Sequence, residues 1–398
     1  MNAPDAAEKR PLRLAIVRQR YNPFGGAERF VERALRALAG SGLDVTLIAR
    51  KWDGPAAEGF HLKKCRPFHF GRLSRDRCFA EAVQRLIRRE GYDLVQSHER
   101  IPGCDIFRAG DGVHATWLEQ RTRTLTRWQR FLQKRSRWHR YTLAAEDAMF
   151  RDARLRAVIC NSHMVRDDIA RRYPDIGHKL HVIHNGVDLT RFSPDLRAQH
   201  RDAVRAQLGV DRRTPVVVYV GSGFARKGVP QLIDAFRNPA LAQAELWIIG
   251  KDRDAKKMVA RAGACGLSFR VRFLGPQQDV TPYLGAADAF ALPTLYDPMP
   301  NAALEALACG LPVLTSRTSG AAELIRPAYG AVVDALDVNG IGRELAHLLA
   351  RVADPAQRDL VCDAARHAVA SMGSDDMATR QLALYRLLLS EAAERSPL

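Results

Sequence analysis

The chain has 398 residues, which is long for one hydrophobic core and sufficient for two domains. Its composition, 46% apolar and 26% charged, is that of an ordinary globular protein and excludes a chain that is disordered over most of its length. The formal net charge of +17 at pH 7 indicates a polyanionic partner, for which nucleic acid, an anionic membrane and a phosphorylated substrate all qualify.

Cysteine spacing and hydropathy bear on compartment and metal binding. No CxxC pair and no Cys/His cluster at metal-ligand spacing occurs, so we expect reduced thiols and a cytosolic location. The beginning of the chain has no apolar core of signal-peptide length, and no later window approaches roughly eighteen uninterrupted apolar residues. We therefore expect neither secretion by that route nor a membrane-spanning segment. The cysteines are Cys65, Cys78, Cys104, Cys160, Cys265, Cys309 and Cys362.

The first elements are predicted to form a βαβ unit. An apolar run at 12–17 predicts a buried strand, the turn-rich YNPFGG loop follows it, and apolar residues at helical spacing predict a helix over 27–40. Residues 44–49 predict a second strand, so we expect a parallel sheet. Further strands are predicted at 92–98 and 155–163.

A second α/β set begins after position 214. Two such sets predict an α/β protein with two doubly wound, Rossmann-like domains facing across a cleft. We place these domains at 1–187 and 188–374, with a hinge in the polar stretch 186–214 and a helix at 375–398 that packs back towards the first domain. The strands predicted in the second set are 214–223, 244–252, 271–275, 289–294 and 311–316, separated by helices such as 228–238 and 301–310.

Two glycine-rich loops are candidates for binding phosphate. In VGSGFARKG the glycines let backbone amides approach a ligand, and Arg226 and Lys227 add two cations just before a helix whose start favours anions. An ordinary strand-to-helix turn with a solvated basic pair accounts for the same residues, and Walker A spacing is absent. In NPFGGAER, Gly25 and Gly26 follow the first strand, but without GxGxxG a plain glycine turn is an equal alternative.

Two carboxylates lie eight positions apart in YDPMPNAALEALACG. Pro300 suits the first turn of a helix and Asn301 a cap, so Glu305 is expected near the helix start and Asp297 in the preceding loop. Both then follow a strand at its carboxyl end, where open α/β sheets bind ligands. A carboxylate can accept hydrogen bonds from two neighbouring hydroxyls, so each of the two acids is suited to bind the hydroxyls of one sugar. Helix-cap electrostatics is the alternative explanation.

The stretch 117–141, WLEQRTRTLTRWQRFLQKRSRWHRY, is the densest basic segment. Its aromatic and apolar residues fall on one helical face, as in a helix at an anionic interface. That face could instead pack on the first domain's core. Nucleic acid is a third candidate partner, although no known nucleic-acid-binding motif accompanies the stretch, and we expect none to bind. The residues expected at a membrane are Trp128, Arg130, Phe131, Lys134, Arg135 and Trp138.

These blocks together resemble the retaining glycosyltransferases of the GT-B fold, specifically group 4. The D-x7-E spacing at 297–305, followed by ALACGLPVLTS, is similar to that group's E-x7-E signature. VGSGFARKG, HVIHNGVDLTRFSP and VICNSH are similar to its other recurrent blocks, in the right order over nearly the whole chain. Within the group, YNPFGGAER, WDGP, IPGCDIFRAGDGVHATWLEQR and GSGFARKGVPQLIDAF resemble the lipopolysaccharide core glucosyltransferases most closely.

The resemblance implies roles for the candidate residues. Glu305 would bind the nucleotide ribose, Asp297 would meet the donor sugar's hydroxyls, and Arg226 and Lys227 would neutralise the leaving diphosphate. Asp111, in AGDGVHA, matches an aspartate facing the reacting centre, where front-face attack makes it an orienting or charge-stabilising group. The group has Glu where this chain has Asp297, which is shorter by about 1.5 Å and leaves the donor sugar open. The other implied donor contacts are Gly25, Gly26, Gly221 and Ser222.

The resemblance also implies a retaining, metal-independent hexosyltransferase with no metal site and no cofactor. A D-x-D pair at Asp252 and Asp254 is a candidate metal ligand set, but it lies among four basic residues and GT-B enzymes generally need no metal. We expect transfer of glucose from UDP-glucose to a heptose of the lipopolysaccharide inner core, at the inner face of the cytoplasmic membrane. Alternatives are another group 4 transferase, a GT-B sugar-nucleotide epimerase and a basic nucleic-acid-binding protein.

Overall fold

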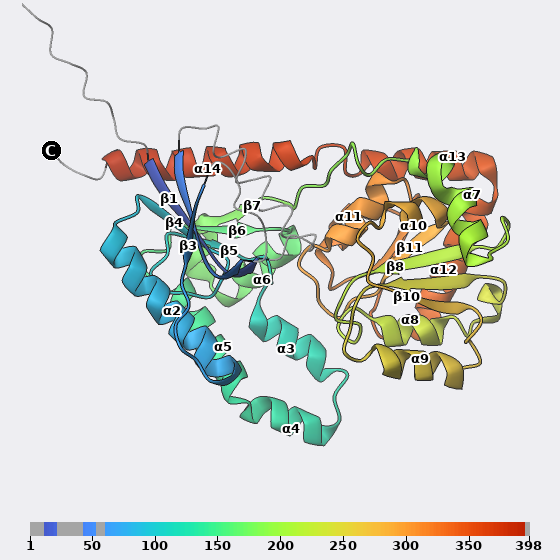
Figure 1. Cartoon of the computed structure of the whole chain (residues 1–398), viewed down its shortest axis with the longest axis horizontal. Coiled ribbons are helices and arrows are strands. Elements are labelled where there is room, and N and C mark those ends of the chain that lie inside the picture. Colours follow the sequence, from blue (N-terminus) through green and yellow to red (C-terminus); the bar gives the residue numbers. More distant parts are fainter. Residues whose placement is uncertain (1–11, 22–42, 53–59, 395–398) are drawn as a thin grey trace, which may run out of the picture.

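The computed structural model describes residues 12–21, 43–52 and 60–394, and in it the chain forms two α/β domains (Figure 1). Within these residues, one sheet has seven strands in the order β3-β2-β1-β4-β5-β6-β7, and the other has six in the order β10-β9-β8-β11-β12-β13. All neighbouring strands in both sheets run parallel. The predicted fold of two doubly wound, Rossmann-like domains is confirmed.

The first domain contains the strands predicted at 12–17, 44–49, 92–98 and 155–163, while the helix predicted at 27–40 lies outside the described residues. Its strands are β1 (Leu12–Tyr21), β2 (Leu43–Trp52), β3 (His61–Lys64), β4 (Leu94–Ser97), β5 (Ile106–Arg108), β6 (Ala157–Cys160) and β7 (Leu180–Val182). Its helices are α2 (Gly71–Glu90), α3 (His114–Thr122), α4 (Arg127–Arg135), α5 (Arg137–Phe150), α6 (His163–Arg172) and the 3₁₀ helix η1 (Pro174–Lys179).

The second domain contains all five of the strands predicted for it. Its strands are β8 (Val216–Val220), β9 (Glu245–Ile249), β10 (Val271–Gly275), β11 (Ala289–Leu292), β12 (Val313–Ser316) and β13 (Gly330–Val333). Its helices are α7 (Leu196–Leu208), α8 (Val229–Ala235), η2 (Pro239–Leu241), α9 (Ala255–Ala264), α10 (Thr281–Ala286), α11 (Asn301–Ala308), η3 (Gly320–Leu324), α12 (Val338–Ala353) and α13 (Pro355–His367); α14 (Ser374–Glu394) follows. In the described part of the chain, no helix is both long and apolar enough to cross a membrane.

Strand β1 shows how the first sheet is covered on both faces. Successive side chains of a strand point to opposite faces. Leu14 and Ile16 pack in one apolar cluster with residues of α14, whereas Ala15 and Val17 pack in another with residues of α2. The run is therefore apolar without alternation, as expected for a parallel strand buried on both faces.

Helix α7 occupies much of the polar stretch in which we expected a hinge. Leu196 and Val204 belong to the core of the second domain. Arg205 is 1% exposed, because its guanidinium donates to Asp288 Oδ2 at 2.7 Å and to the carbonyl oxygen of Thr214 at 2.7 Å. A buried, fully bonded arginine explains why so polar a sequence forms part of a packed domain.

The chain passes between the domains twice, and the two crossings are joined. The first crossing runs through Val187, whose amide donates to the carbonyl oxygen of Met372 at 2.8 Å. Val187 also forms a parallel bridge with Gly373, at the start of the second crossing. Helix α14 then runs along the first domain (Figure 1), where its buried face includes Leu384 and Tyr385.

We predict that Tyr385→Phe destabilises the attachment of α14. The Tyr385 hydroxyl is fully buried and donates to Gln96 Oε1 at 2.7 Å. Losing the donor leaves a buried acceptor poorly satisfied, at a cost of about 1–3 kcal/mol. The midpoint of urea unfolding, followed by circular dichroism, should fall. Leu387→Ala, at a half-exposed position of the same helix, is the control, and equal midpoints for the two variants would contradict the prediction.

Candidate active site between the two domains

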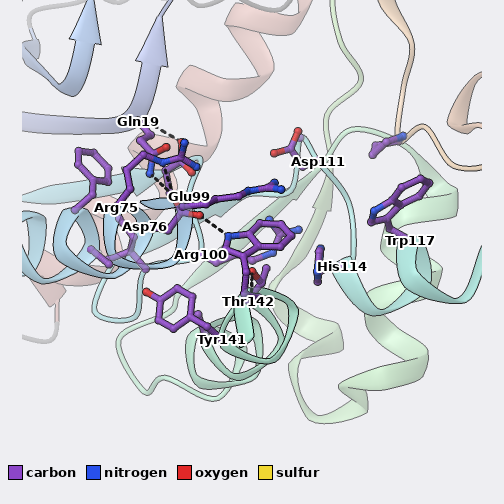
Figure 2. A pocket seen from close by; sticks show the side chains of 18 of the residues that line it. Gln19, Arg75, Asp76, Glu99, Arg100, Asp111, His114, Trp117, Tyr141 and Thr142 are labelled. Atoms are coloured by element: carbon purple, nitrogen blue, oxygen red, sulfur yellow. Dashed lines mark hydrogen bonds and ion pairs between the residues drawn. The ribbon is translucent and has the colours of Figure 1, made fainter. Parts of the chain in front are cut away.

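A cavity of about 460 Å³ lies between the domains (Figure 2). Most of its wall comes from α2, α3, α5 and the loops after β4 and β5, while the second domain contributes Arg226 and residues 296–298. Glu99, Asp111, Arg226 and Asp297 all follow strands at their carboxyl ends. Open parallel sheets bind ligands at that edge, so the cavity is the candidate active site.

Tyr296 joins the two domains beside this cavity. Its ring is 3% exposed, and its hydroxyl accepts a hydrogen bond from the backbone amide of Val113 at 2.9 Å. Gly112 has a φ of +64°, and a side chain there would collide with the Tyr296 hydroxyl. Burial and the nearby charge of Asp168 raise the pKa of Tyr296, so it stays neutral. This contact brings the segment containing Asp111 against the segment containing Asp297.

The glycine-rich loop between β8 and α8 is fixed at both ends. The Gly221 amide donates to the carbonyl oxygen of Ile249 at 2.9 Å, so Gly221 contributes space beside Lys227 rather than a free amide. Ser222 is exposed. Gly228 has a φ of +82°, and a Cβ there would collide with the carbonyl oxygen of Pro293. The loop thus has little freedom to move its basic residues.

Arg226 and Lys227 converge on Asp297. The Lys227 ammonium lies 3.1 Å from Asp297 Oδ2, and the Arg226 guanidinium lies 3.7 Å from the same oxygen. Arg226 also donates to the carbonyl oxygen of Tyr296 at 2.8 Å. Asp297 is 7% exposed, and its backbone pairs with the loop at 318–320, which fixes its position. Two cations share one carboxylate, so a net positive charge remains for an anionic ligand.

Glu305 lies on α11, half-buried and outside the wall of the cavity. The expectation that Asn301 caps this helix is wrong, because the cap position is Pro300, which has no side-chain donor or acceptor. Asn301 instead accepts a hydrogen bond from the Asn185 side chain at 2.8 Å, which ties α11 to the first interdomain crossing. Because Pro300 occupies the cap position, no side chain caps the helix, and the helix start is held instead by the hydrogen bond from Asn185 to Asn301.

The wall opposite Asp297 contains charged residues that sequence reasoning missed. Glu99 follows β4, and its pKa is raised by burial and then by the nearby charge of Asp111, which itself is exposed in the turn after β5. Arg100 pairs with Glu146 at 2.7 Å and donates to the carbonyl oxygen of Gly112 at 2.8 Å. The acid directly after a predicted strand, in YDLVQSHE, was the available signal for Glu99.

Two neutral histidines line or support the same wall. His114 Nε2 lies 3.0 Å from His139 Nδ1, and the Arg121 guanidinium lies 3.2 Å from His139 Nε2. Burial, and after it the positive charge of Arg100, lower the pKa of His114 to about 3. Burial and then Arg121 lower the pKa of His139 to about 4. Both rings are therefore uncharged at pH 7.

The basic stretch 117–141 is not one continuous helix but parts of α3, α4 and α5. Helix α4 has no buried residue, and Trp128 is 67% exposed, with its ring stacked on that of Phe131. Trp138 does not belong to this exposed surface, because its indole donates to Asp76 at 2.8 Å and lies under the Arg72 guanidinium. Arg130 donates to the carbonyl oxygens of Thr122, at the end of α3, and Leu125, in the connection to α4. Phe131, Lys134 and Arg135 are exposed.

The D-x-D pair serves the loop structure. Asp252 accepts hydrogen bonds from the backbone amides of Phe224 at 2.9 Å and Asp254 at 2.7 Å. Asp254 pairs with Lys257 at 3.0 Å, and that hydrogen bond lowers the pKa of Asp254. The Asp252 carboxylate therefore holds the glycine-rich loop against the loop after β9.

A different cluster has metal-ligating side chains. Within the described residues, the ligand atoms of His163, His184 and Glu323 lie within 4.8 Å of one another. Glu323 already accepts from the backbone amide of His163 at 2.9 Å and lies 2.6 Å from His184 Nε2. The carboxylate of the second domain thus contacts two segments of the first. Sequence spacing gave no sign of this cluster, because its members come from three separate segments.

Gly25 and Gly26 lie outside the described residues. Of the other predicted site residues, Asp111, Arg226 and Asp297 line the cavity together, whereas Lys227, Gly221, Ser222 and Glu305 lie outside its wall.

Two family profiles match the sequence. Residues 24–191 match Glycosyltransferase Family 4, and residues 200–360 match Glycosyl transferases group 1. Together these matches span most of the chain and identify it as a glycosyltransferase, and its two Rossmann-like domains have the GT-B fold. It belongs to the group 1/4 family of these enzymes.

Relatives include enzymes of lipopolysaccharide synthesis. The chain is 25% identical over 318 residues to the lipopolysaccharide glucosyltransferase WaaG of Escherichia coli K12, covering 79% of this chain and 83% of the relative. It is 29% identical over 366 residues to the lipopolysaccharide core biosynthesis glycosyltransferase LpsE of Rhizobium meliloti, covering 89% and 96%. The chain is thus related to lipopolysaccharide core glycosyltransferases.

Solved structures of similar fold include that of WaaG, with a TM-score of 0.77 at 23% identity, covering 92% of this chain and 98% of that one. HepE of Anabaena in complex with UDP-glucose has a TM-score of 0.67 at 18% identity, covering 97% and 100%. These likenesses support the GT-B fold.

We predict that the His114 pair makes stability depend on pH. The folded pKa of His114, about 3, is far below its ordinary value of 6.5, so only the unfolded chain takes up a proton as pH falls below about 6.5. The stability that the neutral His114 contributes to the free energy of unfolding is therefore lost progressively as the pH falls from about 6.5 to about 3. In His114→Asn, the loss of stability between pH 7 and pH 5 should be smaller than in the wild type. His61→Asn, at an exposed position, is the control; equal slopes for His114→Asn and the wild type would contradict the prediction.

Proposed function

We propose that this chain transfers glucose from UDP-glucose to a heptose of the lipopolysaccharide inner core, with retention and without a metal ion, at the inner face of the cytoplasmic membrane. The observation that carries the proposal is the cluster of Arg226, Lys227 and Asp297 at the edge of the interdomain cavity. The relationship to WaaG and LpsE supports the acceptor class.

The donor diphosphate would bind at Arg226 and Lys227. A diphosphate carries more negative charge than one carboxylate, so it would compete with Asp297 for both cations. Asp297 would then be released to accept hydrogen bonds from the donor sugar's hydroxyls. As the bond from the sugar to UDP breaks, charge grows on the leaving phosphate, and fixed cations there stabilise the transition state. Glu305 would bind the ribose, and Gly25, Gly26, Gly221 and Ser222 would lie along the nucleotide.

The acceptor would enter from the first-domain side of the cavity. Its hydroxyl would attack the face from which UDP departs and pass its proton to the leaving phosphate. Asp111, with Glu99 beside it, would orient this hydroxyl. Arg72, Arg75 and Arg100 line the cavity and suit a phosphorylated sugar, because arginine pairs well with phosphate.

A group 4 transferase with a different donor is the nearest alternative, because Asp297 replaces the family's longer acid. Thermal shifts with UDP-glucose, UDP-galactose, UDP-N-acetylglucosamine and GDP-mannose separate these donors. The largest shift is expected with UDP-glucose, and a larger one with GDP-mannose would overturn the donor assignment.

We predict that Lys227→Ala lowers kcat for acceptor-dependent UDP release by about 10²- to 10³-fold, because it removes a cation from the leaving diphosphate. The assay uses UDP-glucose and a heptosyl acceptor with EDTA present. Lys251→Ala, on an exposed neighbouring loop, is the matched control. An unchanged kcat in Lys227→Ala would reject the role of this lysine.

Two other outcomes would indicate a different function. Donor interconversion without acceptor would indicate an epimerase, and salt-sensitive DNA binding without nucleotide-sugar binding would indicate a nucleic-acid partner.

We predict that helix α4 binds anionic lipid. Trp128 and Lys134 are exposed, and each basic residue near such a surface contributes roughly 1 kcal/mol. The combined change Trp128→Ser and Lys134→Ala should lower binding to phosphatidylglycerol vesicles by about tenfold in a flotation assay. Lys256→Ala, exposed on the second domain, is expected to bind as the wild type does. Equal flotation of all three proteins would rule out α4 as the lipid-binding element.

A further inference from the structure

Two phenylalanines beside α2 are almost fully exposed. Phe68 is 93% exposed and Phe70 is 91% exposed, in the short connection between β3 and α2. A single exposed apolar residue is common on soluble proteins and needs no explanation. Two phenylalanines on one short loop form an apolar tip, which no other part of the described chain covers.

The loop holds these side chains in place. At its start, the Cys65 amide donates to the carbonyl oxygen of Ala49 at 2.9 Å, continuing the sheet. At its end, the Phe70 amide donates to the Ser74 hydroxyl at 2.7 Å. Because both ends of the loop are anchored, the two rings are displayed by the fold and not by a loose segment.

Basic residues surround the apolar tip. Lys64, Arg66 and Arg72 are exposed within four residues of one of the phenylalanines. The nearby acids are engaged: Asp76 pairs with Arg75 at 2.8 Å, and Glu90 pairs with Lys63 at 2.8 Å. Exposed aromatic rings beside exposed basic residues match an anionic bilayer, where rings enter the acyl region and cations meet phosphates.

The loop lies at the same end of the first domain as α4. The Arg72 guanidinium is 3.4 Å from the centroid of the Trp138 ring, and Trp138 follows the last residue of α4 by only three positions. In Figure 1 the start of α2 and helix α4 both lie at the lower edge of the first domain. Arg72 and Trp138 also line the interdomain cavity. The tip and α4 therefore flank the side of the cavity assigned to the acceptor.

We infer that the loop 65–70 is a second membrane-docking element, whose Phe68 and Phe70 insert into an anionic bilayer while α4 binds the surface alongside. The inference extends the proposed function by naming a further contact of the same membrane. Two-point contact would fix the orientation of the first domain, so that the cavity opens at the lipid headgroups. A lipid-linked acceptor could then reach Arg72 and Arg75 without leaving the membrane.

The test uses the full chain and vesicles of phosphatidylglycerol and phosphatidylethanolamine, with pure phosphatidylcholine for comparison. Phe68→Ser with Phe70→Ser should lower partitioning to the anionic vesicles at least tenfold. The matched control is Phe269→Ser, which removes an equally exposed phenylalanine, 91% exposed, from the second domain and should change partitioning less than twofold. If the double variant partitions as the wild type does, the inference is overturned. The exposed tip would then be assigned to a protein partner and not to the membrane.

A second measurement reports insertion directly. In Phe70→Trp, the added fluorescence should be quenched by lipids brominated on their acyl chains, whereas in Phe269→Trp it should not. Equal quenching in the two variants would also overturn the inference. Transfer to a water-soluble heptosyl acceptor should be the same in Phe68→Ser, Phe70→Ser as in the wild type. Absence of that transfer in the wild type would reject the proposed function and leave the vesicle result standing.

Discussion

The hydrogen bond between Tyr296 and the backbone of Val113 is the contact on which the active-site arrangement depends. Tyr296 directly precedes Asp297, and Val113 follows Asp111 by two residues, and both of these acids line the cavity. Closing this one contact therefore sets the relative position of the two acids. The missing side chain at Gly112 makes the approach possible, and burial keeps the Tyr296 hydroxyl neutral.

Charge balance at the cleft follows from that arrangement. Asp297 occupies Lys227 and Arg226 in the structure described here, so the basic loop is not left with two uncompensated, partly buried cations. Half-buried like charges repel each other strongly unless a counter-charge lies close by. The carboxylate of Asp297 supplies this counter-charge, and under the proposed function a diphosphate would take its place.

Sequence alone predicted the strands well, because buried parallel strands such as 12–17 and 289–292 are short apolar runs bounded by turns. It gave no sign of α7 as a packed helix, because Arg205 is buried through partners far along the chain. Composition also could not separate Trp138, which packs on α2, from Trp128, which faces solvent. The acids and cations of the site were visible as residue types, but the shared ion pair at Asp297 and the role of Tyr296 depend on three-dimensional proximity.

The joined crossings at Val187 and Gly373 have a mechanical consequence. One bridge and one backbone hydrogen bond hold the two crossings side by side, so a rotation between the domains would turn about this pair of segments. Opening of the cleft would then be a rotation of the second domain about the two crossings. Such a joint also tolerates damage, since a protease cut in one crossing leaves the halves linked by the other.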